Sequence, residues 1–100
     1  MSALSVEDRL AILEAKDAIR ELTAAYCFAV ADGRSDDIVA MFTNDGVFKM
    51  RGHAWEGRAA LESMYSDVDA GGATPKPFIQ NHVIDVEGET ATGRCGVEIR

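Results

Sequence analysis

The chain has 100 residues, of which 47% are hydrophobic and 27% are charged, a composition typical of one globular domain with a modest core. Its formal net charge of −7 argues against a nucleic-acid or anionic-membrane partner, because phosphate binding needs a basic surface. No apolar run approaches the roughly 20 residues that span a bilayer, and the N-terminus lacks the features of a secretory signal. We therefore expect a single cytoplasmic domain over residues 1–100, with no nucleic-acid or membrane partner.

The first third of the chain predicts a long helix. Ser5 and the acidic residues after it have the spacing of a helix N-cap, and no proline or glycine interrupts the chain from there to Ala31. Gly33 supplies the stop. The first turns fit the apolar stripe less well, so a short helix leading into a longer one is an alternative. The stripe itself comprises Ile12, Ala15, Ile19, Leu22, Tyr26 and Ala29.

Shorter elements are predicted in the middle of the chain. Ser35 is expected to cap a short helix over 36–42, and the turn residues of 43–46 lead into a strand over 47–51. A further helix is expected from Arg58 to about Ser66, followed by a loop over 69–77 that contains glycines and prolines.

A β-hairpin between Phe78 and Val97 carries one of the two histidines, His82. With a turn centred on Glu87-Gly88, His82 would lie opposite Gly93 and share the apolar face of the hairpin. A titratable imidazole among apolar side chains is the clearest indication of chemistry in this sequence. The expected companions on that face are Phe78, Ile84, Ala91, Cys95 and Val97.

The second strand of this hairpin, from Thr90 to Arg100, would leave a three-stranded sheet with a long uncovered edge. Either the chain was cut short of further strands, or another chain covers that edge. The two cysteines, Cys27 and Cys95, have no metal-ligand spacing and are interpreted as buried thiols.

The ordered set of segments resembles the SnoaL-like branch of the nuclear transport factor 2-like (cone-fold) superfamily. The resemblance is carried by AIRELTAAYCFAVADG, SDDIVAMFTNDGVF, EGRAALESMY and QNHVIDVEGETATGR, which together cover most of residues 5–100. It implies an α+β fold in which a curved antiparallel (mixed) sheet wraps around the N-terminal helices and encloses a pocket. Relative to that cone, the chain is expected to be truncated at its C-terminus. Many members of the superfamily dimerise through the sheet, so a homodimer or higher oligomer is expected.

The resemblance also implies site residues. His82 resembles the first catalytic histidine of the family's dehydratases, and Asp32 resembles their catalytic aspartate. Tyr26 lies where tyrosines commonly face the pocket, and Met50 stands roughly where the fungal dehydratase has a strand tyrosine. Beside them, Phe48 and Trp55 are candidates to line a substrate pocket or simply to pack.

An Asp–His pair suits proton abstraction or donation, because the carboxylate orients the imidazole. The function predicted first is a lyase or isomerase that dehydrates, enolises or cyclises a small apolar molecule bearing a carbonyl or hydroxyl, without a metal or other cofactor. The alternatives are a non-catalytic ligand-binding or dimerisation module and a structural protein like the small subunit of a ring-hydroxylating dioxygenase. Simpler interpretations exist for each residue. His82 fits a hydrogen-bonded strand histidine, Asp32 a helix-ending residue, Tyr26 a core residue and His53 an exposed loop or rim residue.

Overall fold

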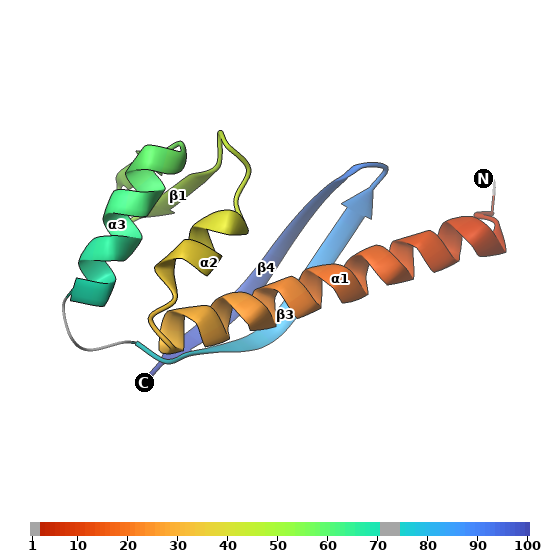
Figure 1. The fold of residues 1–100 in the computed structure, drawn as a ribbon. Helices are drawn as coiled ribbons and strands as arrows, with labels where there is room; N and C mark the ends of the chain where they lie inside the picture. Colours follow the sequence, from red (N-terminus) through yellow and green to blue (C-terminus); the bar gives the residue numbers. More distant parts are fainter. Residues whose placement is uncertain (1–2, 71–74) are drawn as a thin grey trace.

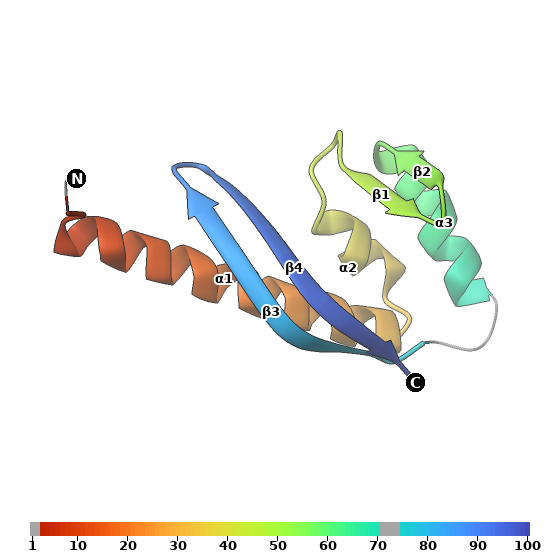
Figure 2. The same ribbon diagram turned by 180° about the vertical axis from the view of Figure 1, so that it is seen from behind.

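The computed structural model describes residues 3–70 and 75–100 and has an α+β fold. Helix α1 runs along the molecule, and the β3–β4 hairpin crosses it, whereas the other elements gather near its C-terminal end (Figures 1 and 2). In the described part of the chain, no helix is long and apolar enough to cross a membrane. The elements are α1 (Val6–Ala31), α2 (Ser35–Ala40), β1 (Val47–Met50), β2 (His53–Glu56), α3 (Arg58–Ala70), β3 (Pro77–Glu87) and β4 (Thr90–Ile99).

Helix α1 is one continuous helix of 26 residues. Its N-cap is the predicted one, because the Ser5 side chain accepts a hydrogen bond from the Asp8 backbone N–H at 3.0 Å. The helix ends at Asp32, and Gly33 then adopts a φ of 68°. The predicted cap of α2 was wrong: Ser35 is the first helical residue, and its predecessor Arg34 makes no side-chain capping bond.

The β1–β2 hairpin contains a strand that was not predicted. The turn between the strands is Arg51-Gly52, with φ of 52° and 81°, and it pairs Met50 with His53. Positive φ at both central residues is the geometry that matches the twist of a two-residue hairpin. His53 is exposed, as predicted, but it begins β2 and is not part of a loop.

The register of β3–β4 differs from the prediction. Glu87 pairs with Thr90, so the turn is Gly88-Glu89, and Gly93 lies opposite Ile84 and not opposite His82. A bulge then shifts the register between Gln80 and Val83, where Asn81 has a φ of 52°. Because the bulge inserts one residue, the strand beyond it turns its other face inward. Phe78 is therefore exposed, and Ile79 is half-buried in its place.

The described strands form two separate two-stranded antiparallel sheets, β1–β2 and β3–β4, where one sheet of three strands was expected. Helix α3 continues to Ala70, beyond its predicted end, and part of the loop predicted over 69–77 lies outside the described residues. The core lies between the three helices, and Ile84 is buried separately, where β3 packs on α1. The core residues are Ala29, Ile38, Val39, Leu61 and Tyr65.

Candidate functional site

A cavity of about 350 Å³ lies against the core, within the size range of small-molecule sites. All three helices, strand β1 and the open end of the β3–β4 hairpin contribute to its wall. Met50, Val97 and Ile99 are each at least half exposed, so the cavity is open on the side that they form. We call it the tyrosine cavity; it is lined by Tyr26, Val30, Ile38, Phe48, Met50, Met64, Tyr65, Pro75, Pro77, Val97 and Ile99.

Two phenol groups are the only side-chain polar groups among the lining residues that the structure describes. The hydroxyl oxygens of Tyr26 on α1 and Tyr65 on α3 are 2.8 Å apart and share a hydrogen bond. Their rings meet edge to face, with centroids 6.3 Å apart and planes at 81°. Phe42 and Phe48 pack against the ring of Tyr65, which is only 4% exposed, whereas Tyr26 is half-buried.

Both hydroxyls hold their protons firmly. Burial raises the pKa of Tyr65 far above its ordinary value of 10.0, and both its hydrogen bond to Tyr26 and the charge of Tyr26 raise it further. Burial also raises the pKa of Tyr26, but there the hydrogen bond with Tyr65 opposes the effect of burial, and the charge of Cys27 adds to it. Either hydroxyl can be the donor in this bond, which uses only one of the two hydroxyl hydrogens. The cavity therefore offers a neutral phenol whose own hydrogen is free to be donated.

The predicted substrate-binding residues lie in or next to this cavity. Tyr26, Phe48 and Met50 line it, whereas Trp55 packs on Phe48 with ring centroids 5.7 Å apart. Their role in binding a substrate stays a prediction.

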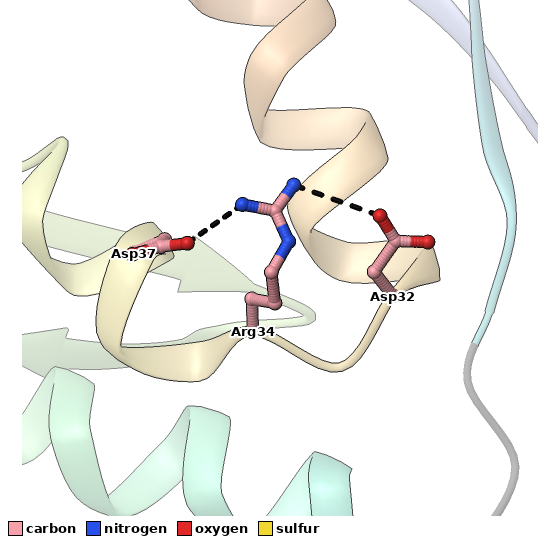
Figure 3. Close-up of polar contacts among 3 residues, drawn as sticks. All are labelled: Asp32, Arg34 and Asp37. Atoms are coloured by element: carbon pink, nitrogen blue, oxygen red, sulfur yellow. Dashed lines mark hydrogen bonds and ion pairs between the residues drawn. The ribbon is translucent and has the colours of Figure 1, made fainter.

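Asp32 lies at the end of α1, outside the cavity wall. Figure 3 shows Arg34 between two carboxylates, with distances of 3.6 Å to Asp32 and 2.6 Å to Asp37. The Asp32 side chain is 59% exposed. An exposed ion pair at the junction of two helices needs no catalytic explanation.

His82 is half-buried on β3, in the register shift, and shares its face with the buried Ile84. Its ring still lies near Gly93, because a Cβ placed on that glycine would be 3.7 Å from the histidine Nε2. Within the described residues, neither His82 nor Asp32 lines the tyrosine cavity, and no hydrogen bond or ion pair joins them. The predicted dyad is therefore not formed here, and the catalytic role of each residue stays a prediction.

Sequence reasoning did not identify Tyr65 as part of a site. The only signal was its place on the apolar side of a predicted helix, which indicates a core residue as readily as a polar contact. Its partner is 39 residues away in sequence, so only the tertiary fold, in which α2 packs against both α1 and α3, brings the two hydroxyls together.

The two cysteines are free, half-buried thiols. Burial raises the pKa of Cys27, and the charge of Cys95 raises it further. Cys27 is therefore held as the protonated thiol, which makes it a poor nucleophile.

Comparison with known families identifies the scaffold. A family model described as a SnoaL-like domain matches residues 11–100. The chain belongs to the SnoaL-like domain family. No significant match is found among curated proteins.

Solved structures share this fold. An NTF2-like protein with a cystatin-like fold from Novosphingobium aromaticivorans is 28% identical, with a TM-score of 0.79 over 99% of this chain and 68% of that one. A protein from the same organism, described as a proposed aromatic ring hydroxylase, is 27% identical, with a TM-score of 0.77 over 97% of this chain and 66% of that one. A protein from a Streptomyces species, named Aln2, is similar in fold alone, at 14% identity, with a TM-score of 0.65 over 99% of this chain and 76% of that one. The chain thus spans about two thirds of the length of the two Novosphingobium structures.

Proposed function

We propose that this SnoaL-like domain binds a small, largely apolar molecule bearing a carbonyl or hydroxyl group in the tyrosine cavity. We further propose that it promotes cofactor-free proton transfer on that molecule, in a dehydration, enolisation or cyclisation. One observation carries the proposal: among the described residues that line the apolar cavity, the hydrogen-bonded pair of Tyr26 and Tyr65 is the single polar side-chain feature. Ligand sites combine an apolar wall with a few convergent polar groups in this way.

The hydroxyl pair suits an oxygen that gains negative charge during a reaction. When Tyr65 donates to Tyr26, it polarises the second hydroxyl, so Tyr26 becomes the stronger donor to a ligand. A fixed donor on an apolar wall is already oriented toward a developing enolate oxygen, whereas water would have to reorient. Tyr26 is also the less buried of the two phenols, so an entering ligand would meet it first.

Binding of a matched ligand pair tests this proposal. We expect 2-tetralone, a bicyclic ketone with a fused benzene ring, to bind more tightly than tetralin, which has the same carbon skeleton and no oxygen. The difference is about tenfold, corresponding to one hydrogen bond of about 1.4 kcal/mol. Isothermal titration calorimetry of both compounds measures it.

The control is Tyr26→Phe, which removes the hydroxyl and keeps the ring. This variant should bind both compounds equally, at the affinity of the wild-type protein for tetralin. If the wild-type protein binds neither compound, or prefers the ketone equally well without the Tyr26 hydroxyl, the proposal is wrong.

A second candidate is a structural role like that of a ring-hydroxylating dioxygenase small subunit. It is favoured by the likeness to the Novosphingobium protein described as a proposed aromatic ring hydroxylase. A protein with that role would act only within a larger assembly, and ligands would have no need of its cavity. The same titration separates the two candidates.

A further inference from the structure

The N-terminal half of α1 carries apolar side chains that the rest of the described structure leaves exposed. Val6, Leu10 and Leu13 recur at intervals of four and three residues, so they lie along one side of the helix, and we call them the α1 stripe. Their exposed fractions are 72%, 53% and 63%. The half-buried Ile12 and Ile19 lie on the other side of α1, against which β3 packs. Figures 1 and 2 show these first turns extending past the tip of the β3–β4 hairpin.

Charged side chains of opposite sign flank the α1 stripe. When Leu10 is placed at position a of a heptad, Val6 and Leu13 fall at position d, the g positions are basic and the e positions are acidic. None of these charged side chains takes part in a hydrogen bond or an ion pair within residues 3–70 and 75–100. The g positions hold Arg9 and Lys16, and the e positions hold Glu7, Glu14 and Glu21.

This charge pattern favours a second copy of α1 in parallel orientation as the partner. In a parallel pair of helices, each g residue lies beside the e residue five positions later on the other helix. Arg9 would face Glu14 of the second copy, and Lys16 would face Glu21 of the second copy. In an antiparallel pair, g residues meet g residues and e residues meet e residues, so like charges would repel. The α1 stripe is therefore complementary to itself in one direction only.

We propose that α1 pairs in parallel with α1 of a second copy of this chain along the α1 stripe. The next a and d positions hold Asp17 and Arg20, so the apolar contact ends after about three turns of helix. A contact this short makes a weak dimer, and salt should weaken it further by screening the flanking ion pairs. The pairing uses a different surface from the β3–β4 sheet, through which the resemblance to the superfamily implies association.

Disulfide cross-linking of the full chain tests the pairing. In a background that carries Cys27→Ala and Cys95→Ala, Leu10→Cys places a thiol at an a position, where the two copies of a parallel pair face each other. The control is Ala18→Cys, on the exposed surface of α1 outside the α1 stripe. Under copper phenanthroline in air, we expect Leu10→Cys to form a covalent dimer about tenfold faster than Ala18→Cys, because pairing raises the local thiol concentration.

Charge reversal tests the direction of the pairing. Arg9→Glu with Lys16→Glu makes both flanks acidic, and Glu14→Lys with Glu21→Lys makes both flanks basic. Either pair of changes should slow cross-linking through Leu10→Cys about tenfold, because attraction becomes repulsion on both sides of the contact. A mixture of the two variants restores every opposite-charge pair, so cross-linking should return as a dimer of one chain of each kind. Restoration also shows that both variants are folded.

Three results together support the inference: faster cross-linking at Leu10→Cys than at Ala18→Cys, loss of this advantage in each charge variant, and its return in the mixture. The same results are expected when Val83→Lys is added, since that change lies on β3. Equal rates at the two positions, or a Leu10→Cys cross-link that forms at the same rate in the charge variants, would overturn it.

Discussion

At the scale of single residues, two phenols determine the chemistry of this molecule. Tyr26 and Tyr65 are the only two tyrosines in the chain, and they form a hydrogen bond to each other at the cavity wall. Every phenolate signal that the protein gives therefore reports on this pair. The raised pKa of each makes the pair a donor of hydrogen bonds and not a base at neutral pH.

Alkaline titration should show these raised pKa values directly. In the folded protein, we expect clearly less phenolate absorbance at pH 10 than in the unfolded protein, where each tyrosine is half ionised, because the pKa of both phenols is raised. The pKa of each tyrosine is higher in the folded state than in the unfolded state. The contribution of the two phenol protons to the free energy of unfolding is therefore fully present below pH 10. It is lost as the pH rises above 10. Urea unfolding should therefore show a steeper fall in unfolding free energy above pH 10 for wild type than for the Tyr26→Phe, Tyr65→Phe double variant. Half ionisation at pH 10 without unfolding would refute the buried, bonded pair.

Part of this site could be predicted from sequence. The spacing of α1 marked Tyr26 as inward-facing, because helical periodicity is a local property. The partnership with Tyr65 could not be predicted, because it depends on how two helices pack. Asp32 shows the opposite case: its position at the end of α1 was predicted, but the carboxylate lies beside Arg34.

At the scale of elements, the helices could be predicted from local capping and stop signals, whereas the two hairpins depend on turn geometry that the sequence pattern does not show. The Ser5 cap and the stop at Gly33 bound α1 correctly. Strand β2 was missed because its turn places Arg51 at positive φ, which residues with a Cβ rarely adopt. Without that turn, the residues before Trp55 do not suggest a hairpin.

The β3–β4 hairpin shows the same limit. Its existence was predicted from alternation, but the turn lies one residue later than expected. The bulge at Asn81 then changes which residues face inward beyond it. A one-residue shift leaves the alternating pattern of the sequence unchanged but turns the other set of side chains inward. Ile79 is therefore half-buried and Phe78 is exposed, the reverse of the prediction.

At the scale of the whole molecule, the described structure is elongated and leaves large apolar side chains exposed to solvent. Its extents are 52 × 27 × 24 Å, and its radius of gyration is 15.8 Å, against about 13 Å for a compact domain of this length. Large apolar side chains are exposed on both the hairpin and the first turns of α1, among them Val83 at 62% and Val6 at 72%. Exposed apolar surface of this kind marks an interface in many proteins.

We propose that the protein forms a homodimer or higher oligomer through the β3–β4 sheet. Sedimentation equilibrium should show a mass above that of one chain at micromolar concentration. Val83→Lys should shift the population toward monomer, because it places a charge on the exposed side of β3. Ala18→Lys adds the same charge on the exposed surface of α1 and should leave the mass unchanged. A monomer at every concentration would contradict this assembly.

The central claim is that the Tyr26 hydroxyl hydrogen-bonds to the carbonyl oxygen of a ligand in the tyrosine cavity. The most direct test is the infrared C=O stretch of bound 2-tetralone, compared in the wild-type protein and Tyr26→Phe. A hydrogen bond weakens the C=O bond, so the stretch should lie below its frequency in an apolar solvent in the wild-type protein and return to that frequency in the variant. The same frequency in both proteins would contradict the account.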